Sequence, residues 1–82
     1  MERSKTFTLR GKGYTLTASQ VRVVAERTEP ASIDRYYVEV ESRPFPIKQI
    51  FGLALRIPPA GFTSQDAYRI LSHLGFEVRQ TS

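Results

Sequence analysis

The chain has 82 residues, with twelve Lys and Arg against eight Asp and Glu and a net charge of +4. A chain of this length supports one small domain with a single core. It contains no cysteine, which excludes disulfides and thiolate metal sites, and its longest apolar run is far too short to span a membrane, so we expect a cytoplasmic protein without a membrane partner.

Residues 1–13 are expected to form a basic N-terminal arm ahead of a single compact domain over residues 14–80. The first 17 residues hold four basic side chains, including Arg10 and Lys12, against one acid. The segment FTLRGKGYTL also has the alternation and the glycine-rich centre of a β-hairpin. Of these two interpretations we favour the arm, with a short strand near its end.

A first helix is predicted over residues 18–28. Thr17 and Gln20 have the spacing of a capping box, in which a hydroxyl and an amide satisfy the free N–H groups of the first turn. Pro30 ends the pattern because proline cannot continue a helix.

The segment YYVEVE, residues 36–41, alternates as a half-buried strand does. Residues 42–44 should turn the chain, and Phe45 should start a short return strand. Tyr36, Val38 and Val40 share one face of the first strand, and Tyr37, Glu39 and Glu41 share the other.

Two more helices follow. The second is predicted to begin near Pro46, since proline is tolerated in a first helical turn, and to end before Pro58. Its apolar residues recur at helical spacing and should face the core: Ile47, Ile50, Phe51, Ala54 and Ile57. The third should begin at the hydroxyl residue Thr63 and run to about Leu74, with Gly75 following in a left-handed conformation. Its inward residues are Ala67, Ile70, Leu71 and Leu74.

The elements expected from residue 14 onward define the fold class. A last strand over Phe76–Val78 gives the order α-β-β-α-α-β. This order implies an α+β domain with a small antiparallel sheet and three helices. Charge is unevenly spread: residues 1–17 and 42–82 each carry +3 and residues 18–41 carry −2, so a polyanion would be attracted to both ends of the chain.

Lys48, Gly52 and Arg56 follow one another at a spacing of four on the second predicted helix. This spacing predicts one ridge opposite the core face. Two cations flanking a glycine would let a helix approach a phosphate chain closely. The alternative is a solvated face on which packing tolerates the glycine.

The second and third helices together resemble a helix-turn-helix arrangement. Thr63 and Ser64 offer hydroxyl and N–H groups to phosphate at a helix start, and Gln65 and Arg69 are of types that reach base edges. The third helix would be the reading helix, and residues 76–80 the start of a wing-like strand. The other interpretation is a plain helical hairpin packed on a sheet.

No constellation in the sequence indicates catalysis. His73 is the only histidine, no nucleophile is paired with a base, and RGKG is too short for a phosphate-binding glycine loop. We therefore expect no enzyme activity, no metal and no cofactor.

An ordered set of motifs extends over residues 36–78. Its elements are Tyr37-Val38-Glu39-Val40, Arg43, Phe45-Pro46-Ile47-Lys48, Phe62-Thr63-Ser64 and Leu74-Gly75-Phe76. The set resembles a family of small, largely uncharacterised bacterial proteins, many of them actinobacterial or cyanobacterial. It is also similar to the N-terminal DNA-reading domain of modified-cytosine-dependent HNH endonucleases of the McrA type. The resemblance implies a DNA-facing module, possible links to restriction or defence, and contacts from Arg43, Lys48, Thr63 and Ser64.

The sequence therefore predicts a small non-catalytic module that binds double-stranded DNA through the second helix and the start of the third. The predicted contact residues are Arg10, Lys12, Arg43, Lys48, Arg56, Thr63, Ser64, Gln65 and Arg69. The alternative is an antitoxin-like or assembly subunit. Such a subunit would bind a protein partner, or a second copy of itself, by strand pairing along Tyr36–Glu41.

Overall fold

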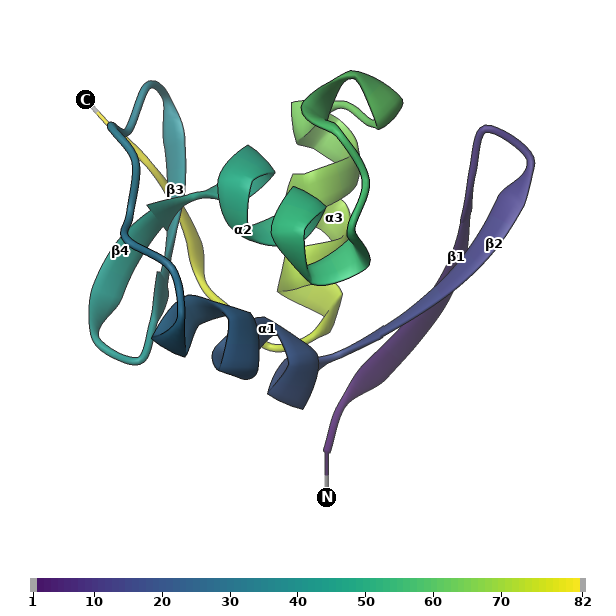
Figure 1. Ribbon diagram of the computed structural model, residues 1–82, viewed down its shortest axis with the longest axis horizontal. Helices are drawn as coiled ribbons and strands as arrows, with labels where there is room; N and C mark the ends of the chain where they lie inside the picture. The colour runs from purple at the N-terminus through teal and green to yellow at the C-terminus, as the bar shows by residue number, and fades with distance from the viewer. Residues whose placement is uncertain (1, 82) are drawn as a thin grey trace.

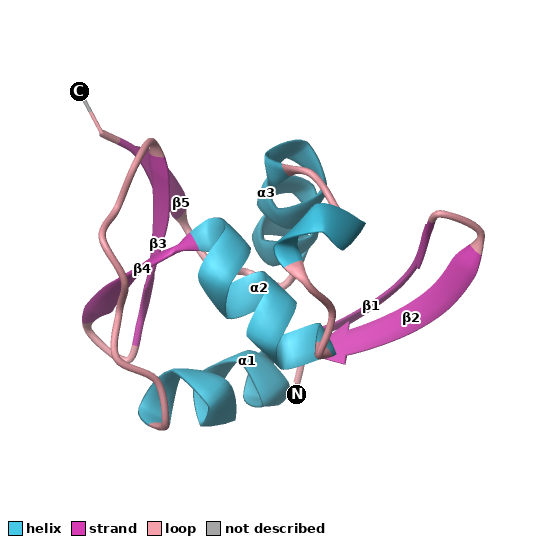
Figure 2. Ribbon diagram, turned by 45° about the horizontal axis from the view of Figure 1, so that its top comes forward, coloured by secondary structure: helices cyan, strands magenta, loops and turns pink. Residues whose placement is uncertain are grey.

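The computed structural model describes residues 2–81 and contains two antiparallel sheets and three helices (Figure 1). In chain order the elements are β1 (Ser4–Leu9), β2 (Lys12–Thr17), α1 (Ala18–Glu26), β3 (Tyr36–Val40), β4 (Arg43–Pro46), α2 (Ile47–Leu55), the 3₁₀ turn η1 (Pro59–Gly61), α3 (Ser64–His73) and β5 (Val78–Gln80). The predicted α+β class is confirmed, with two strands added before the expected order. Helices α2 and α3 lie between the β1–β2 hairpin and the sheet β4-β3-β5 in both views (Figures 1 and 2).

The N-terminal segment is a β-hairpin, so the predicted arm over residues 1–13 is wrong. Phe7 and Leu9 are buried in the core, and the Phe7 ring lies 5.9 Å from that of Phe51. Arg10 and Gly11 form the two-residue turn with φ of 51° and 81°, the conformation that matches the twist of paired strands. The alternating apolar residues of the hairpin pack into the core, and the basic side chains at its turn are exposed to solvent.

Helix α1 begins where it was predicted. Thr17 and Gln20 form the capping box, with the Thr17 hydroxyl accepting from the Gln20 N–H at 3.1 Å. The carboxylate of Glu2 accepts a hydrogen bond from the N–H of Ser19 at 2.5 Å, and hydrogen bonding by the Ser19 side chain lowers the pKa of Glu2. The helix ends at Glu26, two residues earlier than expected.

Strand β3 is the central strand of its sheet. Val38 and Val40 are buried and Tyr36 is half-buried, as alternation predicted. Strand β4 pairs with one edge of β3, and β5 pairs with the other over Tyr36–Val38. Our alternative prediction was that a partner strand pairs along Tyr36–Glu41. Over Tyr36–Val38, β3 has no free edge for such a partner, because β4 and β5 flank it.

The β3–β4 turn lies at Glu41 and Ser42, ahead of its predicted place. Both residues have positive φ, 53° and 65°, and a side chain costs roughly 1–2 kcal/mol in that region relative to glycine. Ser42→Gly should therefore raise the free energy of unfolding by about 1 kcal/mol. Urea denaturation measures this effect. Ser72→Gly on the exposed face of α3 is the control and should lose about 1 kcal/mol instead; equal losses in both variants would contradict the turn geometry.

Helix α2 supplies the centre of the core. Ile47, Ile50 and Phe51 are buried, and Phe51 packs edge-on against Phe62 with centroids 4.9 Å apart. Pro46 is the residue that precedes the first turn, and Arg56 ends the helix in a left-handed conformation with φ 60°. The inward residues predicted for α3 are all buried, and Gly75 has φ 94° as predicted. Within residues 2–81, no helix has the length and apolar character needed to cross a membrane.

Candidate nucleic-acid interface

Lys48, Gly52 and Arg56 do not form the predicted ridge. Gly52 is buried, and a Cβ atom there would lie 3.3 Å from the ring of Phe62 and 3.1 Å from the carbonyl oxygen of Ile57. Helix α2 ends before Arg56. The absence of a side chain at Gly52 therefore allows Phe62 and the Ile57 carbonyl to pack closely on α2, which the spacing of four did not reveal.

Arg43 has a structural role that competes with the predicted DNA contact. Its guanidinium donates a hydrogen bond to the carbonyl oxygen of Ala25, at the C-terminal end of α1. It also lies over the ring of Phe45, 5.2 Å from the centroid. A cation at a helix C-terminus is favoured by the unpaired carbonyl groups there, so Arg43 stabilises the α1–β4 contact; its predicted DNA contact stays a prediction.

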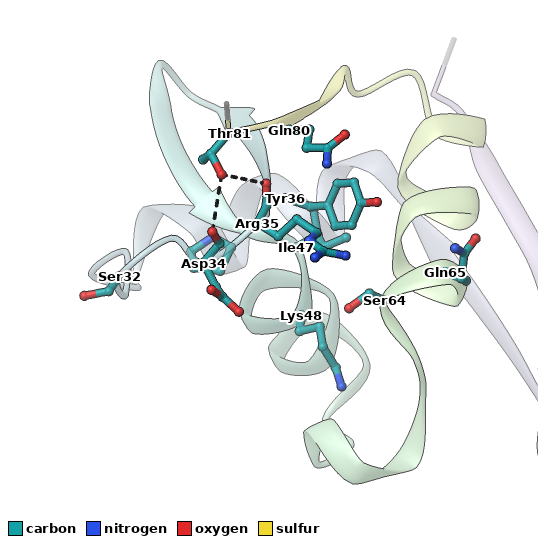
Figure 3. Close-up of a pocket in the computed structure, with 11 residues that line it drawn as sticks. Ser32, Asp34, Arg35, Tyr36, Ile47, Lys48, Ser64, Gln65, Gln80 and Thr81 are labelled. Atoms are coloured by element: carbon teal, nitrogen blue, oxygen red, sulfur yellow. Dashed lines mark hydrogen bonds between the residues drawn. The ribbon is translucent and has the colours of Figure 1, made fainter.

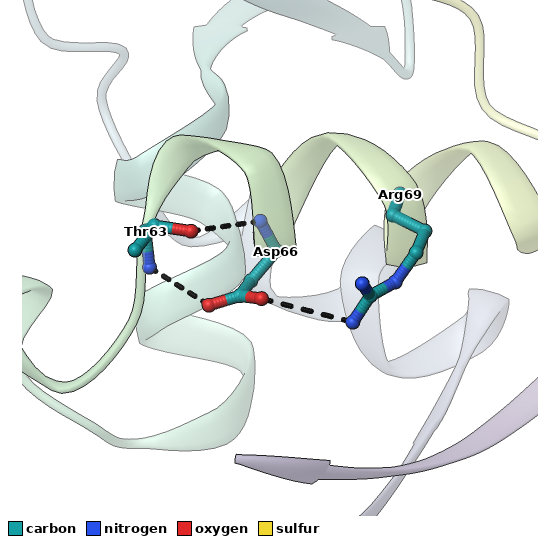
Figure 4. A network of polar contacts seen from close by, with 3 residues as sticks. All are labelled: Thr63, Asp66 and Arg69. Atoms are coloured by element: carbon teal, nitrogen blue, oxygen red, sulfur yellow. Dashed lines mark hydrogen bonds and ion pairs between the residues drawn. The ribbon is translucent and has the colours of Figure 1, made fainter. Parts of the chain in front are cut away.

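Thr63 is also committed to local structure. Its hydroxyl accepts from the N–H of Asp66 at 3.1 Å, and its own N–H donates to the Asp66 carboxylate at 3.0 Å (Figure 4). The same carboxylate pairs with Arg69 at 3.7 Å. The cap uses the Thr63 N–H and places a carboxylate beside the Thr63 hydroxyl, which disfavours the predicted phosphate contact; that contact stays a prediction. Arg69 stays exposed, but its charge faces Asp66.

Removing this cap should affect stability more than binding. Thr63→Ala should lower the free energy of unfolding by about 1 kcal/mol, the usual cost of losing a hydroxyl cap. Thermal unfolding followed by circular dichroism tests this, and Thr8→Ala, at an exposed position of β1, is a control for loss of a hydroxyl. A fully stable Thr63→Ala variant that no longer binds DNA would return Thr63 to the interface.

Lys48, Ser64 and Gln65, three of the predicted residues, line one open groove of about 730 Å³ (Figure 3). The groove lies between the first turns of α2 and α3 and one end of the β3–β5 pair. Arg35 and Tyr36 line it from the start of β3, and Gln80 and Thr81 from the end of β5. A shallower extension of about 280 Å³ reaches Tyr68 on α3.

The groove is cationic and rich in hydrogen-bonding groups. Arg35 and Lys48 carry its positive charge, and Asp34 is the one carboxylate among the described lining residues. Figure 3 shows the side chains of Arg35, Ser64 and Gln80 turned toward the same space. No side chain caps the N-terminus of α2, whose first N–H groups therefore lack a side-chain acceptor, and Pro46, Ile47 and Lys48 at this end line the groove.

Two tyrosines form part of the groove wall. The rings of Tyr36 and Tyr68 meet edge to face, 5.7 Å apart. Tyr68 keeps a large exposed area. The wall therefore combines aromatic surface with the amides of Gln65 and Gln80.

The other predicted contact residues lie outside this groove. Arg10 belongs to the hairpin turn, and Lys12 stands 5.7 Å from the ring centroid of Tyr14. Arg56 lines a different groove, beside β2. We predicted three of the lining residues from the sequence and missed Arg35, Tyr36, Gln80 and Thr81. The Thr81 hydroxyl donates to the carbonyl oxygens of Asp34 and Arg35, and these hydrogen bonds bring the two ends of the wall together.

The helix-turn-helix resemblance holds only for the order of the elements. Helices α2 and α3 are consecutive and in contact, but residues 56–63, which include η1, separate them in the chain. Strand β5 is an edge strand of the sheet and pairs with β3; a wing role for residues 76–80 stays a prediction.

Comparison with models of known protein families, with curated proteins and with solved structures finds no match to this chain. Among residues 2–81, no three His, Cys, Asp or Glu side chains come together as metal ligands. The assignment of function therefore rests on the geometry of the groove.

Proposed function

We propose that this protein is a small non-catalytic module that binds double-stranded DNA through the groove between α2, α3 and the β3–β5 pair. The observation that carries the proposal is the convergence of Arg35, Lys48 and the uncapped first turn of α2 on one open groove. Cationic side chains and free helical N–H groups are the partners that a phosphate backbone requires. An open groove also suits a continuous polymer better than it suits a small enclosed ligand.

Different residues of the groove would make different contacts. Arg35 and Lys48 would neutralise phosphates and set the position of the module on the duplex, without reading sequence. The amides of Gln65 and Gln80 face the same groove and can make paired hydrogen bonds to the edge of adenine. The proposed interface is therefore the groove and not the predicted ridge. Lys48, Ser64 and Gln65, which were predicted as contact residues, lie in this groove.

Binding to several duplexes of different defined sequence over a salt series tests this division of roles. Arg35→Ala and Lys48→Ala should each weaken binding on every sequence and each lower the salt slope by about one unit. Gln65→Ala should instead reduce any preference between sequences, by about 1–3 kcal/mol per lost base contact. Fluorescence anisotropy with a labelled duplex measures both effects.

Arg79→Ala is the matched control. Arg79 follows Val78 on the same strand as Gln80, but it pairs with Glu39 and Glu77, and its hydrogen bond to Glu77 raises the pKa of the guanidinium. Its loss should leave the salt slope nearly unchanged. If Arg79→Ala weakens binding as much as Lys48→Ala does, the effect is one of net charge and the groove is not the interface.

A further inference from the structure

A second groove, separate from the proposed DNA interface, lies between β2, α1 and α2. Its volume is about 520 Å³, and its apolar lining includes Tyr14, Val23, Leu53 and Leu55. Val23 and Leu53, on two different helices, are 45% and 48% exposed and line the same groove. Apolar side chains of another chain could bury this surface.

Strand β2 borders this groove with a free edge. In the part of the chain that the structure describes, β2 pairs with β1 alone. The two-residue turn makes Leu9 and Lys12 the hydrogen-bonded pair that closes the hairpin, so alternation directs the N–H and C=O groups of Gly13 and Thr15 toward the free edge. The close approach of the Thr6 and Thr15 hydroxyls, at 3.1 Å, fits a pair without backbone hydrogen bonds, as this register requires.

Two cations and one carboxylate stand at the groove; the carboxylate is that of Glu2, which accepts from the N–H of Ser19 in the lining. Arg56 lines the groove, and Lys12 stands over the ring of Tyr14, which is also part of its wall. No Asp or Glu is among the described residues that line it. An occupant with carboxylates at its ends would therefore be complementary, whereas a cationic one would be repelled.

We propose that this groove binds an extended segment of a partner protein, which adds as a strand to the free edge of β2. The backbone of the segment pairs with Gly13 and Thr15. Every second side chain is apolar and lies on Val23 and Leu53, because residues of a strand alternate between its two faces. Acidic residues flank this core and face Lys12 and Arg56.

A second copy of this chain fits the same groove less well. A symmetric contact places the same surface of each copy against the other. That contact would bring Lys12 and Arg56 of two chains, each with a net charge of +4, into one interface. The repulsion favours an acidic partner over self-association.

The test begins with the full chain as a target for a phage-displayed library of random dodecapeptides. The enriched peptides should alternate apolar residues at every second position and carry Asp or Glu at their ends. A labelled synthetic peptide of the enriched sequence should bind Leu53→Asp at least about tenfold more weakly than wild type, which is the effect expected for one anchoring side chain. Ser72→Asp places the same charge at an exposed residue of α3 that lines neither groove and should bind normally.

Amide hydrogen exchange separates strand addition from simple apolar contact. When the synthetic peptide binds, exchange should slow at the N–H groups of Gly13 and Thr15, while that of Tyr14, already paired with β1, should change little. Enriched peptides with helical periodicity, binding that Leu53→Asp leaves intact, or no enrichment would each overturn the proposal. So would a dimer of the protein alone that Leu53→Asp dissociates.

Discussion

Phe51→Ala is expected to lower the free energy of unfolding by about 3–5 kcal/mol, the usual cost of removing a large aromatic side chain from a core. Phe51 is fully buried at the centre of the core and its ring meets two others, that of Phe62 at 4.9 Å and that of Phe7 at 5.9 Å. The two contacts join α2 to the segment before α3 and to the hairpin. Loss of the ring therefore leaves a cavity at a point where several elements meet.

Urea denaturation followed by circular dichroism measures this loss. Leu53→Ala, on the same helix but 48% exposed, is the control and should lose much less. The loss expected for Phe51→Ala is a large part of the typical stability of a small domain, about 5–15 kcal/mol. A Phe51→Ala variant as stable as Leu53→Ala would contradict the described packing of α2.

Deletion of residues 2–11 is expected to unfold the domain. The deletion removes Phe7 and Leu9 from the core. Leu16, which is fully buried in the intact domain, loses the strand beside it. Burial of each large side chain contributes about 1.5–3 kcal/mol, so two of them account for much of the stability of a domain this small. A mobile basic arm would predict the opposite, namely a melting transition that the truncation leaves nearly unchanged.

The dispersion of amide signals in a ¹H–¹⁵N spectrum of the truncated protein decides between these expectations. Thr8→Ala is the control within the hairpin, because Thr8 is exposed and pairs with Gly13 on the solvent side. That variant should keep its stability within about 0.5 kcal/mol. A truncated protein with a native-like spectrum would show that β1 is dispensable for folding.

Features determined by a few neighbouring residues could be predicted from the sequence. The capping box of Thr17 and Gln20 and the left-handed Gly75 depend on backbone groups within a few positions, so their residue types are enough to locate them. Alternation likewise predicted the buried face of β3 correctly. Such patterns depend on contacts between residues that are close in the sequence.

The errors arose where distant residues meet. Helix α2 ends at Leu55 and packs Gly52 against Phe62, ten residues further on, so the spacing of Lys48 and Arg56 gave a false ridge. The arm was favoured over the hairpin because the hairpin's stability depends on the contact of Phe7 with Phe51, which is distant in the sequence. The groove escaped prediction because its wall joins Arg35 to Thr81, and no local pattern relates residues so far apart.

Titration of the ¹⁵N-labelled protein with a short duplex, followed by ¹H–¹⁵N spectra at low salt, tests the proposed DNA-binding groove most directly. The groove predicts that the largest shifts fall on Arg35, Lys48, Ser64 and Gln65, and that they shrink as salt rises because phosphate contacts are screened and compete with counterions. Shifts confined to the hairpin, or no shift at any residue at low salt, would contradict binding of DNA in the groove.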